Sequence, residues 1–110
     1  MLICHNNQTQ TQGTISSTAY GPSFQTDRAY AVSAQCIVTA AAPTGASVQL
    51  QKSNDNVNWS NDGAPVSVTA TGVFFVEKVG ITSKYMRVAY VISGGSMSSS
   101  TVLCLICDMP

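Results

Sequence analysis

A chain of 110 residues, of which 9% are charged, is long enough for one folded domain with a single core and too short for two. Its five basic and five acidic side chains cancel, so net charge gives no reason to expect nucleic acid or an anionic membrane as a partner. Ser, Thr, Asn and Gln replace the usual surface charges. Such a surface suits a domain packed against other proteins, and it equally suits a plain β-domain rich in hydroxyl groups.

The start of the chain, Met1 to Asn7, has no basic cluster and no apolar run of signal-peptide length. No apolar stretch approaches the roughly 20 residues of a membrane span. We therefore expect synthesis in a reducing cytoplasm, with the cysteines as thiols. Residues 1–13 are rich in Gln, Thr and Asn without periodicity, which predicts an extended N-terminal arm followed by one domain over residues 14–110.

Beyond this arm, apolar and polar residues alternate with the period of two that is typical of β-strands. The predicted strands are Thr14–Tyr20, Arg28–Ala40, Ala46–Lys52, Val57–Ser60, Val66–Ala70, Val73–Val79, Lys84–Ile92 and Ser99–Cys107. Turn residues separate several of them, as in Pro43-Thr44-Gly45 and Gly94-Gly95-Ser96. Seven or eight strands without a helical period predict an all-β fold, namely an antiparallel β-sandwich of jelly-roll-like or immunoglobulin-like topology.

The alternation also predicts which side chains face the core. The inward side is predicted to carry Tyr30, Val32, Ala34, Cys36, Val38, Val48 and Leu50, and the outward side Ala31, Ser33, Gln35, Thr39, Ser47, Gln49 and Gln51. Strand Val73–Val79 is apolar on both faces, which predicts that it is either central in its sheet or covered on both sides. Ser53-Asn54-Asp55-Asn56 predicts a hairpin loop, because Asn and Asp accept left-handed backbone angles and their side chains can close a turn.

The titratable residues are few and scattered, so we expect no catalytic site and no enzyme. Cys104 and Cys107 have CxxC spacing, and Cys4-His5 offers further zinc ligands. Residues three apart on a strand point to opposite faces, however, which favours cysteines that serve as small apolar residues. The Asn/Asp-rich loop lacks the residue order of a known calcium motif. We therefore expect neither a metal nor another cofactor.

Trp59 and Arg87 leave alternatives open. Trp59 either fills the core, as a lone Trp beyond a hairpin commonly does, or stacks a sugar together with a tyrosine. The tyrosines considered for this platform are Tyr20, Tyr30, Tyr85 and Tyr90. Arg87 lies in an apolar strand, where it either extends to a rim or pairs with Glu77 or Asp62.

The segments VQLQKSNDNVNW (48–59) and KYMRVAY (84–90) resemble a pattern that recurs in small virion proteins of tailed bacteriophages. In that pattern, a strand of the type xLQxSNDGxNW leads through a Val/Thr strand to xYxRVxY. Related SNDG-x-x-W hairpins occur in discoidin-like and other carbohydrate-binding sandwiches. Asn56 stands where the pattern has Gly, which keeps the turn but gives the backbone less freedom.

The resemblance implies a structural role in the virion, as a capsid decoration or cement protein. Such proteins form dimers or trimers and bridge major capsid subunits, and multivalent contact strengthens their binding. A tail, fibre or baseplate component is the alternative. A glycan-binding module that uses Trp59 is a third possibility. We expect neither nucleic acid nor a membrane as a partner.

We predict contacts to other virion proteins along the arm, which can add a strand to a neighbour's sheet, and along the outward polar face. The residues predicted to make these contacts are Leu2, Ile3, Gln8, Gln10, Gln12, Ser33, Gln35, Gln49 and Gln51.

Overall fold

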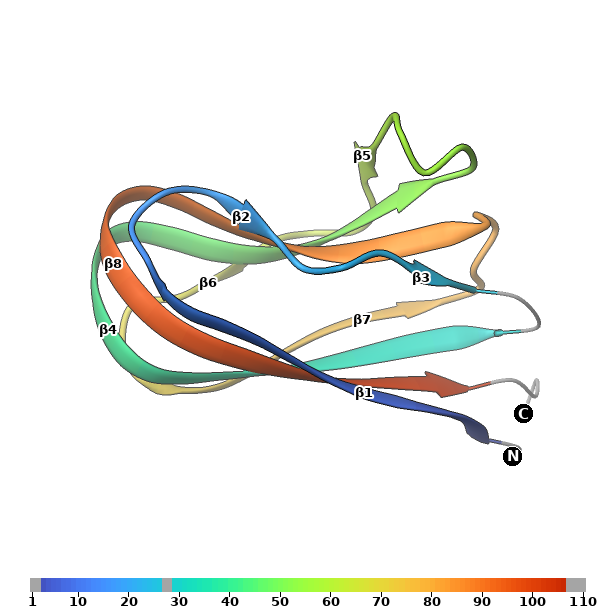
Figure 1. Cartoon of the computed structure of the whole chain (residues 1–110), viewed down its shortest axis with the longest axis horizontal. Helices are drawn as coiled ribbons and strands as arrows, with labels where there is room; N and C mark the ends of the chain where they lie inside the picture. The colour runs from blue at the N-terminus through green and yellow to red at the C-terminus, as the bar shows by residue number, and fades with distance from the viewer. Residues whose placement is uncertain (1–2, 27–28, 107–110) are drawn as a thin grey trace.

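The computed structural model describes residues 3–26 and 29–106, with only the backbone described for residues 3–12 and 40–44. The chain is all-β, and its strands form one antiparallel sheet that curls back on itself (Figure 1). The strands are β1 (Ile3–Ile15), β2 (Ala19–Tyr20), β3 (Phe24–Gln25), β4 (Ala31–Ser53), β5 (Ser60–Asn61), β6 (Val66–Ser67), β7 (Gly72–Val79) and β8 (Tyr85–Ile106). In this described part of the chain, no helix is long and apolar enough to cross a bilayer.

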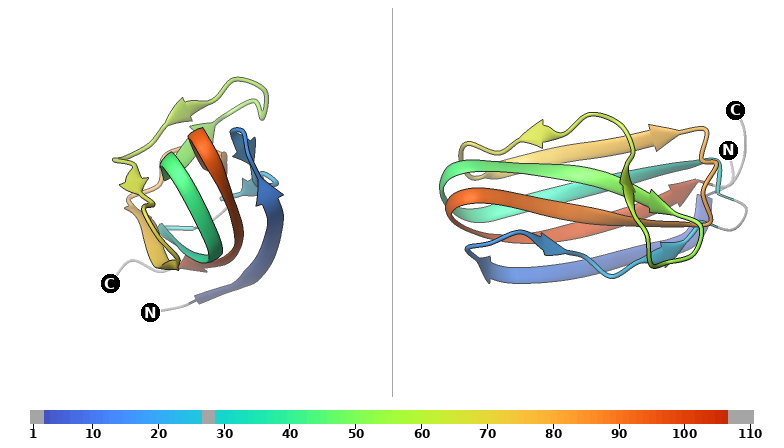
Figure 2. Two further views of the ribbon diagram at one scale, coloured as in Figure 1. Left: turned by 90° about the vertical axis from the view of Figure 1, so that its left-hand side faces the viewer. Right: turned by 90° about the horizontal axis from the view of Figure 1, so that it is seen from above.

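Strands β4 and β8 pair along their full length, from Ala31 opposite Ile106 to Ser53 opposite Tyr85. Both bend midway, so each contributes to both halves of the curled sheet (Figure 2). The first, here called the β7 half, contains β1, β7 and the adjoining segments 31–38 and 97–106. The second, the β5 half, contains β2, β3, β5, β6 and the segments 46–53 and 85–92.

The turns predicted at Pro43-Thr44-Gly45 and Gly94-Gly95-Ser96 are wrong, because β4 and β8 continue through both segments. Pro43 lies opposite Gly95 and Gly45 lies opposite Gly94, with register shifts beside them. Residues that weaken a strand therefore face one another, and the two strands bend together instead of reversing. Gly45 fits this bend closely, since a Cβ there would clash with Ser93 Oγ unless that hydroxyl turned away.

The segment predicted as an arm is, in its described part, strand β1. It pairs with β8 from Ile3 opposite Ile106 to Ile15 opposite Met97. The boundary that the sequence suggested at residue 13 therefore falls inside this strand, and the chain's own β8 supplies its hydrogen-bonding partner.

The core lies inside the curl, between the two halves. Of the residues predicted to share the inward side, Val32, Ala34, Cys36, Val38, Val48 and Leu50 are buried, whereas Tyr30 at the start of this run is only half-buried. Met86, Val88, Tyr90 and Leu103 of β8 complete the same cluster. The expectation that β7 is central or covered on both sides is wrong, because Val73, Phe75 and Val79 remain 53%, 50% and 62% exposed. Among the described strands, β7 pairs with β4 alone and lies at an edge of the sheet.

Candidate functional site

Three separate segments meet at Arg87 on the outer surface of the β5 half. Tyr20 of β2 lies opposite Ala89, two residues from Arg87 on β8. Gln51 of β4 lies directly opposite Arg87. Strand β5 returns alongside β4, with Asn61 opposite Gln51, and it brings the preceding Trp59 over the sheet. Strand register thus assembles residues that lie far apart in the sequence.

The Arg87 guanidinium lies over two aromatic rings. Its Cζ atom is 3.9 Å from the centroid of the Tyr20 ring and 4.4 Å from that of the Trp59 ring. Arg87 Nε donates to Gln51 Oε1 at 2.7 Å, and Gln51 Nε2 lies 3.1 Å from Asn61 Oδ1, to which it donates. We call these five residues the Arg87 cluster. Partial burial lowers the pKa of Arg87, but an arginine remains a cation at neutral pH.

The pairing predicted between Arg87 and Glu77 or Asp62 is wrong. Glu77 accepts a hydrogen bond from Ser33 at 3.1 Å, and Asp62 forms an ion pair with Lys78 at 3.3 Å. Both carboxylates therefore have other partners. Stacking on rings suits a guanidinium here, because it is planar and more weakly hydrated than an ammonium group.

Trp59 is half-buried and does not belong to the core cluster. Of the tyrosines considered for a platform, Tyr20 contacts the same guanidinium as Trp59, whereas Tyr90 is buried in the core. The inner faces of the Tyr20 and Trp59 rings are therefore occupied by Arg87. No sequence pattern reveals this arrangement, because it depends on the pairing of β2 with β8.

A hairpin loop lies where the sequence predicts one, but it spans residues 54–59, because Ser53 still belongs to β4 and the returning strand begins at Ser60 and not at Val57. Asp55 organises this loop. Asp55 Oδ1 accepts from the backbone amides of Val57 and Asn58 at 2.9 and 2.8 Å. These bonds hold the pKa of Asp55 well below its usual range. Asn56 takes the left-handed conformation at φ 61°, as the Asn-rich sequence predicts.

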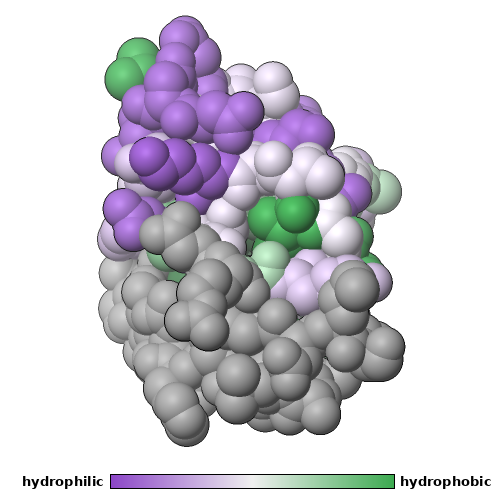
Figure 3. Space-filling view, turned by 90° about the vertical axis from the view of Figure 1, so that its right-hand side faces the viewer, coloured by the Kyte–Doolittle hydropathy of each residue, from purple (hydrophilic) through white to green (hydrophobic). Residues whose placement is uncertain are grey.

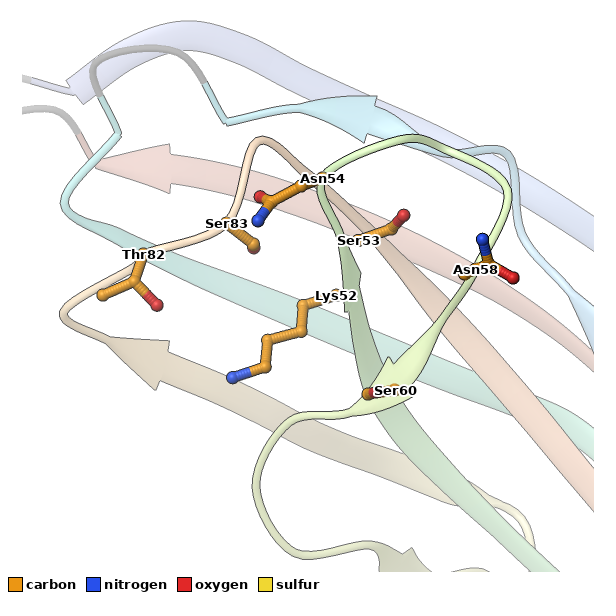
Figure 4. Close-up of a pocket in the computed structure, with 7 residues that line it drawn as sticks. All are labelled: Lys52, Ser53, Asn54, Asn58, Ser60, Thr82 and Ser83. Atoms are coloured by element: carbon orange, nitrogen blue, oxygen red, sulfur yellow. The ribbon is translucent and has the colours of Figure 1, made fainter.

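A polar hollow of about 250 Å³ lies beside this loop (Figure 4). Its lining is made of hydroxyl, amide and ammonium groups from Lys52, Ser53, Asn54, Asn58, Ser60, Thr82 and Ser83. The backbone amide of Lys84 donates to Asn54 Oδ1 at 3.0 Å, which ties the hairpin to the loop before β8. Hydrophilic side chains gather at this end, over the segment between β4 and β5 (Figure 3).

The outer surface of the β7 half is more apolar. It carries Val73, Phe75 and Val79 of β7, and half-buried Ile37 lies opposite Val73. We call these four residues the β7 face. A hollow of about 300 Å³ adjoins it, lined by Leu50, Asp62, Gly63, Ala64, Val66, Phe75, Val76 and Glu77.

The residues predicted to contact partners do not share one surface. Half-buried Ser33 and Gln35 lie opposite Glu77 and Phe75, next to the β7 face. Gln51 belongs to the Arg87 cluster. Gln49 is only 4% exposed, and its amide donates to the carbonyl of Gly63 at 2.8 Å, so this side chain is covered. Leu2 lies outside the described residues. Ile3, Gln8, Gln10 and Gln12 lie in β1, where only the backbone is described.

Cys36 lies in the core, in agreement with an apolar role, and burial raises the pKa of its thiol. Cys104 is half-buried and free. Cys107 and the side chain of Cys4 lie outside what the structure describes, so of the CxxC pair only Cys104 is described. Among the residues whose side chains the structure describes (13–26, 29–39 and 45–106), no group of three His, Cys, Asp or Glu side chains gathers at one place.

Comparison with known proteins gives no match, either to a protein-family model or to a curated protein sequence.

Proposed function

We propose that this protein is a non-catalytic structural subunit of a tailed-phage virion, and specifically a capsid decoration protein that bridges major capsid subunits. It is proposed to act as a dimer or trimer on the capsid surface, after synthesis in the host cytoplasm. The virion assignment rests on the resemblance of segments 48–59 and 84–90 to small phage virion proteins. The subunit-packing role rests on the β7 face.

The observation that carries the packing role is the exposure of Val73, Phe75 and Val79 along one strand. Single exposed apolar residues are common on protein surfaces, but aligned ones mark surfaces that other proteins cover. These three lie on an edge strand, whose free backbone groups are a template for pairing with another chain. Burying this strand against a neighbouring subunit would cover its apolar side chains and would give its unpaired backbone groups hydrogen-bonding partners.

The finer description of the fold belongs to this proposal. We propose that the two halves act as the layers of a β-sandwich of jelly-roll-like or immunoglobulin-like topology. The shared core between the halves supports the layered description. A sheet in which β4 and β8 run without a break through both layers gives a stiff subunit, because no flexible link separates the layers.

Quantitative mass spectrometry of purified, salt-washed particles tests the proposal. A decoration protein is expected in a fixed ratio to the major capsid protein and in many copies. A tail, fibre or baseplate component, which is the alternative, is expected in far fewer copies and in the tail fraction after particle disruption. Absence of the protein from both fractions would contradict a virion role.

A carbohydrate-binding module is a second class of function, favoured by the position of Trp59 outside the core. Trp59→Ala separates the two classes, since glycan retention is lost in a folded variant only if the module binds sugar through this ring. Particle incorporation, in contrast, is expected to survive this substitution if the β7 face makes the contacts.

A further inference from the structure

The Arg87 cluster holds a cation whose binding directions are restricted by its neighbours. The Tyr20 and Trp59 rings both lie against the guanidinium, with their centroids 3.9 and 4.4 Å from Cζ. A further partner can therefore reach the cation most readily at the N–H groups of the two Nη atoms. The aromatic rings also limit the access of water to any pair formed there, which strengthens a charged hydrogen bond.

The N–H groups of Arg87 are only partly used. A guanidinium has five N–H donors, and here Nε donates to Gln51 Oε1 at 2.7 Å. No other described residue accepts a hydrogen bond from the Nη atoms. The one ion pair in the described part of the chain joins Lys78 to Asp62, so no described carboxylate neutralises Arg87. The Nη groups of this half-buried cation are therefore available to an anionic ligand.

The orientation of the Arg87 guanidinium is set before any ligand binds. Gln51 directs its oxygen to Arg87 because its amide nitrogen donates to Asn61 Oδ1 at 3.1 Å. Asn61 is itself positioned by the β5–β4 pairing, and Tyr20 by the β2–β8 pairing. The cluster therefore rests on sheet hydrogen bonds, and little side-chain freedom remains to be lost when a ligand binds.

We propose that Arg87 binds the carboxylate of an acidic sugar through its two Nη groups, with Tyr20 and Trp59 flanking the pair. A carboxylate matches the planar fork of a guanidinium with two parallel hydrogen bonds. A neutral sugar lacks this match, and Arg87 already occupies the inner face of each ring. Amide and phenol groups beside Arg87 (Gln51, Asn61 and Tyr20) suit sugar hydroxyls. This inference goes beyond the virion proposal and does not depend on it.

Trp59 is the sole tryptophan of the chain, so its fluorescence reports on the site directly. The full-length protein is titrated with sodium galacturonate at constant ionic strength, with galactose and sodium acetate in parallel. Galacturonate is expected to change the emission saturably and galactose is not. Acetate is expected to bind at least about tenfold more weakly, since it lacks the hydroxyl contacts.

Variants assign the binding to the guanidinium. Arg87→Gln is expected to abolish the response, and Arg87→Lys to weaken it at least about tenfold, because an ammonium keeps the charge and loses the fork. Gln51→Glu preserves the size of the side chain and is expected to weaken binding by placing a competing carboxylate against Arg87. Lys84→Gln is the matched control, since Lys84 stacks on Tyr85 at 5.5 Å in the same half, and it should titrate like the wild type.

Thermal unfolding of each variant separates lost binding from lost fold. If Arg87→Gln unfolds the protein, the Gln51→Glu titration decides the question. An unchanged galacturonate response in folded Arg87→Gln or in Gln51→Glu would overturn the proposal. Equal responses to galactose and galacturonate, or no saturable response to galacturonate, would overturn it as well. Equal affinity for acetate would overturn the assignment to a sugar.

Discussion

On its outer surface the β7 half exposes Val73, Phe75 and Val79, whereas the β5 half carries Arg87 stacked on Tyr20 and Trp59. Both halves are built on the same two strands, β4 and β8, and both bury their inward residues in one core. The difference teaches that the alternation of these strands fixes the interior, while the short strands paired beside them determine what each outer surface offers. One surface is suited to burial by protein and the other to recognition of a polar ligand.

The largest effect is expected where the halves share their interior. Leu50 is 2% exposed within the core, and Leu50→Ala should lower the free energy of unfolding by about 2–5 kcal/mol. Urea denaturation followed by circular dichroism measures it. Two separate transitions, in place of one, would contradict a single core that joins both halves.

A smaller effect is expected from the stacked surface. Trp59→Ala removes one ring from Arg87, and a stack at an exposed site contributes about 0.5–1 kcal/mol, so the variant should remain folded with slightly reduced stability. Thermal unfolding measures this change. Trp59→Phe, which keeps a ring, is the control. Loss of the folded state in Trp59→Ala would place Trp59 in the core instead.

The loop beside that surface should respond to acid. The bonds to Asp55 hold its pKa below that of the unfolded chain, which is about 4. The stabilisation is therefore fully present above about pH 4 and is lost as pH falls from there toward the depressed native pKa. Asp55→Asn should lower the melting temperature at pH 6, and the difference from the wild type should shrink on acidification. A difference that grows toward low pH would contradict this account.

The smallest change in stability is expected on the β7 face. Phe75 is 50% exposed, so Phe75→Ser should alter the free energy of unfolding by no more than about 0.5 kcal/mol. Self-association of the purified protein, measured by sedimentation velocity, should nevertheless decrease. Val57→Ser is the matched control, because Val57 is 74% exposed but isolated on the hairpin loop. Equal association of both variants would argue against the β7 face.

The sequence predicts the inward residues well, because a period of two is a local property of a strand. Val48 and Leu50 are buried as their alternation indicates. The bends at Pro43 and Gly95 were not predictable as bends, since Pro and Gly weaken a strand whether the chain reverses or curves. What decides the outcome is that they lie opposite one another, which is a property of register.

The Arg87 cluster could be predicted only in part, for the same reason. The sequence singles out Trp59 and Arg87 as unusual, and the hairpin brings β5 back to Gln51. The contribution of Tyr20 depends on β2, a strand of two residues that pairs with a part of β8 far away in the sequence. Gln49 was predicted to face outward toward partners, and it does lie at an outward position of its strand. The chain segment at Gly63 nevertheless covers this side chain, which the strand pattern alone does not reveal.

The β7 face as a surface buried against other subunits is the central claim, and site-specific photocrosslinking in assembled particles tests it most directly. A photoreactive phenylalanine analogue replaces Phe75 in one variant and Val57 in another, and the particles are irradiated after purification. The account predicts covalent adducts to another virion subunit from position 75 and none from position 57. Adducts from position 57 alone, or none from position 75 in particles that contain the protein, would contradict it.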